Sequence, residues 1–156
     1  GVIDVLNRFT KLISPKIIFM GEKDYQQFFL VKDYITKRYE TQVFLCKTIR
    51  DANGAALSSR NKLLNKSDLA ILGLITGELI KLKRTICNQN KRGSINTKIS
   101  NMLIKETKKN LIKKFDIKIE YLECRNLINL NRNINIKPFK LFISYYINGV
   151  RLIDNF

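Results

Sequence analysis

The stretch Gly21-Glu22-Lys23-Asp24-Tyr25-Gln26-Gln27 decides how the first part of the chain folds. The apolar run 17–20 precedes it and is typical of a buried strand, while apolar residues at helical spacing follow it. These following residues are Phe28, Leu30, Val31, Tyr34 and Ile35. The stretch is therefore predicted to be a strand-to-helix turn, in which Gly21 allows a tight turn and Asp24 is the helix N-cap.

This turn is a candidate anion site, because a helix N-terminus favours negative charge and Lys23 adds a cation beside it. Gln26 and Gln27 follow in the first helical turn, and at least one is expected to face the same crevice. An aspartate N-cap also occurs without any ligand, so the turn alone is better explained as ordinary structure.

A second polar stretch favours the ligand interpretation. It reads Arg50-Asp51-Ala52-Asn53-Gly54-Ala55-Ala56-Leu57-Ser58-Ser59-Arg60-Asn61. It combines an Asn-Gly turn with two adjacent hydroxyls and an arginine, groups that donate hydrogen bonds to phosphate oxygens. Because Ser58, Ser59 and Arg60 have no apolar stripe around them, we expect little except a ligand to hold this loop.

The net charge of the 156-residue chain is +16, from 29 Lys and Arg against 13 Asp and Glu. Such an excess favours a nucleic-acid partner. However, Lys, Ile and Asn are abundant throughout and the lysines are scattered, which is typical of a genome rich in A and T. A basic nucleic-acid-binding module is kept as the alternative function. No membrane partner is predicted, since no apolar run approaches the ~20 residues that span a bilayer.

The three cysteines, Cys46, Cys87 and Cys124, are far apart, and the chain contains no histidine. The lack of histidine excludes a Ser-His or Cys-His nucleophile within this chain and argues against zinc, so no metal site is predicted. Cys46 lies in an apolar strand and is expected to be a small core residue. This cysteine usage indicates a reduced, cytoplasmic location.

Residues 1 to about 47 alternate between helix and strand, which predicts a parallel α/β sheet. The expected elements are a helix over 1–13, a strand over 17–20, a helix over 24–38, a strand over 41–47 and a polar loop over 48–65. The first helix has an apolar face formed by Val2, Val5, Leu6, Phe9, Leu12 and Ile13. Two strands do not make a stable doubly wound sheet, so we expect these residues to be the second half of a larger domain.

Residues 66–156 are predicted to form a small α+β domain with an antiparallel sheet. A helix capped by Ser67 runs to Ile86 and buries Leu69, Leu72, Ile75, Leu79 and Leu82. After a turn over 88–94, a second helix to residue 114 buries Ile95, Ile99, Met102, Leu103 and Ile112. A strand then alternates through Ile117, Ile119 and Tyr121. An Asn-rich excursion over 126–138 leads to a strand over 139–147, an Asn148-Gly149 hairpin turn and a return strand over 150–153.

The stretch 21–27 and Leu57-Ser58-Ser59-Arg60-Asn61 together resemble the pantothenate synthetase (pantoate–β-alanine ligase) family. The ending Arg151-Leu152-Ile153-Asp154-Asn155 is similar to the terminus of that family. The resemblance implies the second half of a Rossmann-like nucleotidyltransferase domain over 1–65, followed by a small lid domain over 66–156. It implies a cytoplasmic ligase of pantothenate and coenzyme A biosynthesis, which condenses pantoate with β-alanine through a pantoyl-adenylate and converts ATP to AMP and diphosphate.

The resemblance also assigns roles to residues of this chain. ATP would be a co-substrate, with Mg²⁺ bound to it. It would meet Gly21, Glu22, Lys23, Asp24, Ile49, Leu57, Ser58, Ser59 and Arg60. Lys23 would be catalytic, stabilising the charge that develops in the transition state, and Gln27 would hydrogen-bond pantoate.

Two features depart from the family pattern. Ala55 stands where the family usually has leucine, and its small side chain is expected to loosen the loop. The larger departure is that the family's Met-Gly-x-Leu-His-x-Gly-His motif and a further pantoate-binding glutamine, both from its N-terminal half, are absent. We therefore expect a C-terminal portion that does not complete the reaction alone, with an inactive fragment of a degenerate gene as a further alternative. A homodimer through the family's N-terminal half is left open.

Overall fold

Residues 1–89, 97–132 and 138–156 are described by the computed structural model, which divides into two units, Gly1–Ile49 and Arg50–Phe156. We predicted a boundary after residue 65, whereas the loop over 50–65 packs within the second unit. The reason is that Arg50 forms an ion pair with Asp154 near the end of the chain. The functional division at residue 65 stays a prediction.

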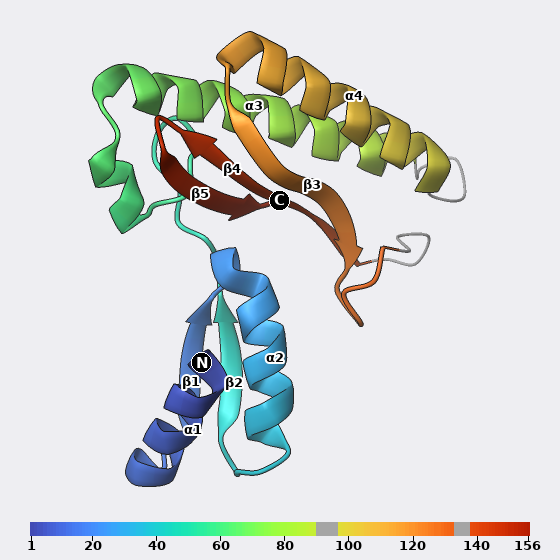
Figure 1. The fold of residues 1–156 in the computed structure, drawn as a ribbon. Helices are drawn as coiled ribbons and strands as arrows, with labels where there is room; N and C mark the ends of the chain where they lie inside the picture. The colour runs from blue at the N-terminus through green and yellow to red at the C-terminus, as the bar shows by residue number, and fades with distance from the viewer. Residues whose placement is uncertain (90–96, 133–137) are drawn as a thin grey trace. The chain divides into compact units, whose positions relative to one another are not determined.

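The first unit consists of α1 (Val2–Ile13), β1 (Ile17–Gly21), the 3₁₀ turn η1 (Glu22–Asp24), α2 (Tyr25–Thr36) and β2 (Gln42–Cys46) (Figure 1). β1 and β2 pair in parallel, as predicted. α2 packs on this pair through Tyr25, Phe28, Val31 and Ile35. Leu30 was expected on the same face but is 54% exposed. It follows Phe28 by two residues, which places it on the opposite side of the helix.

Two apolar surfaces of this unit are open. On the sheet, Phe19 of β1 is 68% exposed, and its ring lies 6.1 Å from that of Phe44 on β2. The apolar face of α1 is likewise open, with more than two fifths of each side chain exposed at Val2, Val5, Phe9, Leu12 and Ile13. Cys46 was expected in the core but is exposed. It lies two residues after Phe44 and therefore on the same open face of the strand.

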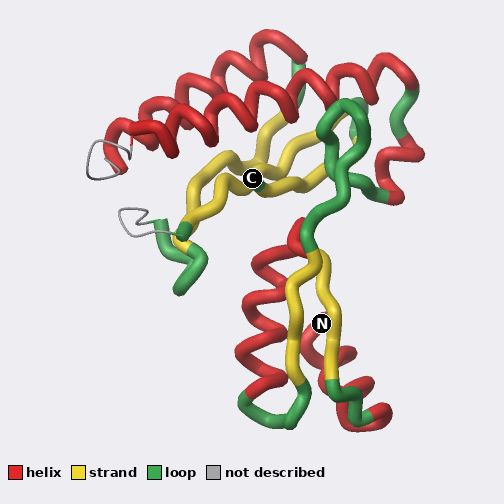
Figure 2. The backbone as a smooth tube through the Cα atoms, turned by 180° about the vertical axis from the view of Figure 1, so that it is seen from behind, coloured by secondary structure: helices red, strands yellow, loops and turns green. Residues whose placement is uncertain are grey.

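The second unit consists of η2 (Ser59–Leu63), α3 (Lys66–Gln89), α4 (Thr97–Phe115), β3 (Lys118–Asn126), β4 (Phe139–Ile147) and β5 (Val150–Asn155). The strands form an antiparallel sheet in the order β3-β4-β5, and α3 and α4 lie against one face of it (Figures 1 and 2). The predicted hairpin turn is confirmed, since Asn148 and Gly149 both have positive φ, at 45° and 76°. No helix of the described residues has the length and apolar character needed to cross a membrane.

The predicted buried stripe of α3 is confirmed at Leu72, Ile75, Leu79 and Leu82, but its predicted cap is wrong. Asn65, not Ser67, caps this helix. The Asn65 side-chain oxygen accepts the Asp68 N–H at 2.9 Å, and the Asn65 N–H donates to the Asp68 carboxylate at 3.4 Å. This reciprocal pair is a capping box, and Ser67 serves only as a donor to the Asn65 oxygen.

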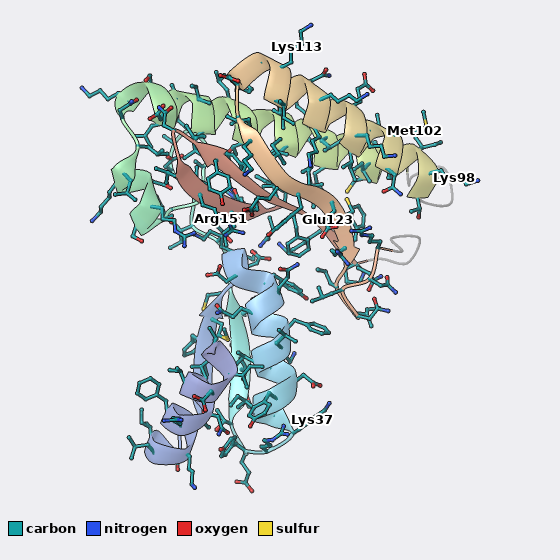
Figure 3. The ribbon with its side chains drawn as sticks, viewed as in Figure 1. Lys37, Lys98, Met102, Lys113, Glu123 and Arg151 are labelled. Carbon is teal, nitrogen blue, oxygen red and sulfur yellow. The ribbon has the colours of Figure 1, made fainter. Side chains whose placement is uncertain are left out.

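The predicted inward face of α4 is largely wrong. Ile99, Met102 and Ile112 are 44%, 69% and 39% exposed, and Met102 points away from the sheet (Figure 3). Ile104 and Leu111 are buried instead, seven residues apart on one side of the helix. Ile95 and residues 90–94 of the predicted turn lie outside the described residues, whereas α3 continues through positions 88 and 89. The part of the Asn-rich excursion over 133–137 also lies outside them.

β3 contains an irregularity that overturns the alternation expected at Tyr121. Its register against β4 shifts between Ile119 and Tyr121. After this bulge Leu122 and Cys124 are buried, while Tyr121 is only half-buried.

Glu120, the residue at the bulge, gathers three donors from β4 and β5. Its carboxylate accepts from the Ser144 hydroxyl at 2.7 Å, the Tyr146 hydroxyl at 2.8 Å and Arg151 Nε at 3.0 Å. The Arg151 guanidinium, followed by the two hydroxyls, lowers the pKa of Glu120 from 4.5 to about 2. The cluster joins all three strands and holds the Arg151 side chain in place.

The first prediction concerns the pH dependence of stability. The depressed pKa means that Glu120 stabilises the fold above pH 4.5, and that this contribution is lost as the pH falls toward 2. We expect Glu120→Gln to lower the urea midpoint at about pH 6. The gap between parent and variant should narrow at about pH 4 and again at about pH 3. Urea unfolding followed by circular dichroism measures the gap, and a gap that does not change with pH would contradict this assignment.

The second prediction concerns the open surfaces of the first unit. Each large apolar side chain left exposed forgoes roughly 1.5–3 kcal/mol of burial. We therefore expect the amides of residues 17–20 and 43–46 to exchange hydrogen faster than those of the central strand β4. Hydrogen exchange read by NMR on the monomeric chain is the measurement. Protection of both strands equal to that of β4 would overturn the prediction.

Candidate functional site

The carboxyl edge of the two-stranded sheet collects one group of predicted site residues. β1 and β2 end side by side, with Gly21 opposite Cys46. η1 leaves β1 at this edge, and residues 47–49 leave β2. The Thr48 N–H donates to the Glu22 carboxylate at 3.3 Å and so links the two segments. In α/β sheets, ligands bind outside the carboxyl ends of parallel strands. The structure thus brings the predicted ATP-binding residues 21–24 and Ile49 to one edge.

Gly21 is not required by the turn, contrary to our expectation. Its backbone has φ −71° and ψ 135°, an extended conformation that any residue adopts. A Cβ atom added at Gly21 would meet nothing within 4 Å, so the backbone here is open to a ligand. The reason to keep Gly21 in the candidate site is this open surface, not backbone freedom.

Asp24 occupies the N-cap of α2 as predicted, but its side chain makes no capping hydrogen bond. The residue is exposed, which leaves its carboxylate at the surface of the carboxyl edge. Lys23 is half-buried in η1 directly before it. Tyr25, the first residue of α2, is buried, and both this burial and the neighbouring Glu22 carboxylate raise the pKa of its hydroxyl.

Gln27 lies in a groove of about 660 Å³ between α1 and α2. The groove is mainly apolar, and Gln26, Asp4 and Asn7 add polar groups to its lining. Its volume falls in the range of pockets that bind small molecules. We expected at least one of the two glutamines to face the same crevice as the turn over 21–24. Both line this groove instead, and none of residues 21–24 belongs to its lining.

The second polar stretch forms a closed and well-bonded loop. The Asp51 carboxylate accepts the N–H groups of Asn53 and Ala55, each at 2.9 Å. Gly54 has a positive φ of 79° in the resulting turn. Arg50 and Ala56 form an isolated antiparallel β-bridge across it. Ala55 was expected to loosen the loop. That expectation is wrong, since Ala55 is only 1% exposed and belongs to the core of the second unit.

The predicted phosphate-binding residues follow this turn. Leu57 is 54% exposed, Ser58 caps η2 by accepting the Arg60 N–H at 3.3 Å, and Ser59 begins η2. The Arg60 guanidinium donates to the Arg151 carbonyl at 3.3 Å, and the Asn61 amide donates to the Ala56 carbonyl at 3.0 Å. The expectation that little except a ligand holds this loop is therefore wrong.

Arg60 differs from the two other arginines around β5 in the charge of its partner. Arg50 pairs with Asp154 at 2.8 Å, and Arg151 pairs with Glu120 at 2.8 Å. Arg60 donates to a neutral carbonyl, so its positive charge is not offset in the same way. A phosphate group would supply the missing negative partner.

The predicted site residues are distributed over both units. Gly21, Glu22, Lys23, Asp24, Gln27 and Ile49 belong to the first, and Leu57, Ser58, Ser59 and Arg60 belong to the second. Sequence reasoning did not single out Thr48, whose buried hydroxyl has no hydrogen-bond partner among the described residues. It also did not single out Arg50 or Asp154. In the described ranges, no three His, Cys, Asp or Glu side chains gather as a metal cluster would require.

Comparison with known proteins identifies one family. A family profile described as pantoate-beta-alanine ligase matches residues 1–156. The chain is 34% identical over 158 residues to a pantothenate synthetase of Leptospira interrogans, a match that covers 99% of this chain and 53% of that protein. It is 38% identical over 142 residues to a bifunctional pantoate ligase/cytidylate kinase of Prochlorococcus marinus, which covers 87% of this chain and 26% of that protein.

Solved structures agree with this result at the level of the fold. Pantothenate synthetase from Thermus thermophilus superposes with a TM-score of 0.84 at 24% identity, over all of this chain and 54% of that one. The pantoate-beta-alanine ligase of Francisella tularensis, described as complexed with beta-gamma ATP and beta-alanine, has a TM-score of 0.69 at 29% identity. That match covers all of this chain and 49% of the other. The chain thus spans about half the length of most of these relatives.

Proposed function

Because the chain belongs to the pantoate–β-alanine ligase family, we propose that it carries part of the active site of an AMP-forming ligase that joins pantoate to β-alanine. The observation that carries this proposal is the carboxyl edge of β1 and β2, where an open glycine backbone, Lys23 and Asp24 lie together. The phosphate loop over 57–60 is the second part. The lid role of residues 66–156 and a cytoplasmic location belong to the same proposal.

The reaction proceeds in two steps, and its only reactants are ATP, pantoate and β-alanine. A pantoate carboxylate oxygen attacks the α-phosphorus of ATP, the bond to the β-phosphate oxygen breaks, and diphosphate leaves. The amine of β-alanine then attacks the acyl carbon of the pantoyl-adenylate, AMP leaves with the electron pair of the C–O bond, and the amine nitrogen loses a proton. Both steps depend on positioning and on stabilising negative charge, and neither needs a protein nucleophile.

The residues of this chain have the chemistry for those tasks. The open backbone at Gly21 lies against the nucleoside, and Asp24 accepts hydrogen bonds from the ribose hydroxyls. Lys23 stabilises the charge that moves onto the leaving diphosphate, and Arg60 with its neighbouring hydroxyls binds the phosphates. Gln27 donates to pantoate in the groove between α1 and α2. ATP brings its own Mg²⁺.

Binding of ATP to the 156-residue chain tests the proposal directly. We expect added ATP and Mg²⁺ to shift the NMR amide signals of residues 21–24 and 57–60, and pantoate to strengthen ATP binding. Arg60→Ala should weaken ATP binding, and Lys62→Ala, at another basic residue of η2, is its matched control. If no site amide shifts with ATP, while an RNA oligonucleotide binds with an affinity that falls steeply with salt, the nucleic-acid alternative is favoured instead.

The third prediction concerns Lys23 and uses the chain joined to the amino-terminal half of the Leptospira interrogans relative. We expect Lys23→Ala to slow adenylation far more than it weakens ATP binding, because several groups share the binding of ATP. An interaction made mainly in the transition state appears in the rate constant. Loss of one such preorganised group costs about 10²–10³ in rate. Lys23→Arg is not expected to restore it, since a planar fork replaces a compact charge.

Single-turnover formation of the pantoyl-adenylate is the measurement. Lys16→Ala is the control, because Lys16 is an exposed lysine at the opposite end of β1. If Lys23→Ala forms the adenylate at nearly the parent rate and only needs more ATP, Lys23 acts in binding and the catalytic role is wrong.

A further inference from the structure

Arg50 joins the loop over 51–60 to the end of the chain through four hydrogen bonds from one guanidinium. Its Nη1 donates to the Gly54 carbonyl at 2.9 Å and to Asp154 Oδ2 at 2.8 Å. Its Nη2 donates to Asp154 Oδ1 at 3.0 Å and to the Asn155 carbonyl at 2.9 Å. The guanidinium carbon also lies 4.6 Å from the ring centroid of Phe156.

This arrangement depends on the planar fork of arginine. The two parallel bonds to Asp154 fix the plane of the guanidinium, and the remaining N–H groups then point at the two carbonyls. The Asp154 side chain is only 7% exposed and that of Arg50 is 25% exposed. Breaking such a pair leaves a charge without its partner in a place that water reaches poorly, so the loop must move to relieve it.

The loop rests on β5 at both of its ends. Arg50 precedes the Asn53-Gly54 turn and binds Asp154 and Asn155, while Arg60 follows the turn and donates to the Arg151 carbonyl. β5 is one of the two edge strands of the three-stranded sheet, so its outer backbone groups are available for these contacts.

The turn between these ends is also seated on α3. A Cβ atom built at Gly73 would come within 2.9 Å of the Asn53 side chain. At Gly54 an added Cβ would lie 3.4 Å from a Thr76 methyl group. The turn therefore cannot shift toward α3, and the Arg50 contacts prevent it from lifting away.

We propose that Arg50 and Asp154 are positioning residues, which hold the loop over 51–60 in the conformation that presents Ser58, Ser59 and Arg60 to a triphosphate. That Arg50 and Asp154 hold the loop, their holding role, follows from the contacts above. That the loop presents its side chains to a triphosphate rests on the proposed function. In this proposal both residues act through the loop and not on the nucleotide itself.

The experiment uses Asp154→Asn in the 156-residue chain and compares it with Glu123→Gln. Glu123 lies on β3, which β4 separates from β5, pairs with Arg125 at 2.7 Å, and its side chain is 19% exposed, so it is a comparable ion pair on another strand of the same sheet. Arg50→Lys is added because it keeps the charge and loses the fork.

The first readout is hydrogen exchange of the amides of Asp51, Gly54 and Asn61, which are hydrogen-bonded within the loop. We expect Asp154→Asn and Arg50→Lys to raise their exchange rates at least about tenfold, while the amides of β4 stay near the parent rates. Glu123→Gln should leave the loop amides unchanged. Loop amides that keep the parent rates in Asp154→Asn, or that rise only together with those of β4, would overturn the holding role.

The second readout separates positioning from general loss of structure. We expect Asp154→Asn to weaken binding of ATP about tenfold, the size of losing one charge-assisted hydrogen bond, and to leave binding of adenosine unchanged. Equal weakening of ATP and adenosine would contradict the positioning of a phosphate loop. If the parent chain binds no ATP, the proposed function is wrong at this loop, and the presentation of these residues to a triphosphate falls with it. The exchange readout then still decides the holding role.

Discussion

The fork of Arg50 is the interaction on which the second half of the candidate site depends. It joins residues up to 105 positions apart in the sequence, and in one plane it satisfies a carboxylate and two backbone carbonyls. A loop of this length needs such a contact because it has little to bury. Its buried apolar residues are the two small side chains of Ala55 and Ala56. A single charged anchor and a close seat on Gly73 replace the apolar packing that holds a helix or strand.

The elements of the fold were predictable where local chemistry decides them. Period and turn residues located β1, α2, α3 and the Asn148-Gly149 hairpin to within a few residues. The errors arise where a distant neighbour decides. Cys46 looks like a core residue in an apolar strand, but its face of the sheet is open. Met102 was expected on the inward face of its helix because it is apolar, but α4 turns Ile104 and Leu111 toward the sheet instead. The bulge at Glu120 is set by partners on β4 and β5, which the sequence of β3 does not reveal.

The sequence indicated which residues to consider for the candidate site. It did not reveal the backbone geometry and the contacts that hold those residues. The turn over 21–24 lies at a carboxyl edge, as a strand followed by a helix requires. Its glycine, however, has ordinary backbone angles, and its N-cap aspartate does not cap. The pair of Arg50 and Asp154 gave no local signal, because its members lie 104 residues apart. Only the likeness of the stretches 57–61 and 151–155 to one family linked the regions of these two residues before the structure showed the ion pair.

The pairing of charges shows which arginines of a chain with a net charge of +16 belong to its scaffold. Around β5, the arginines at 50 and 151 are each matched by a carboxylate, which converts them from anion-binding groups into parts of the scaffold. Arg60 is held by a neutral carbonyl and keeps its charge for an incoming group. At the carboxyl edge of the first unit, Glu22 and Asp24 stand beside Lys23, so this edge by itself is poorly suited to a highly charged triphosphate. Carboxylates instead suit the hydroxyls of a sugar. This charge pattern supports the proposal that the first unit binds mainly the nucleoside and the loop of the second binds mainly the phosphates, with Lys23 acting on the charge that moves during the reaction.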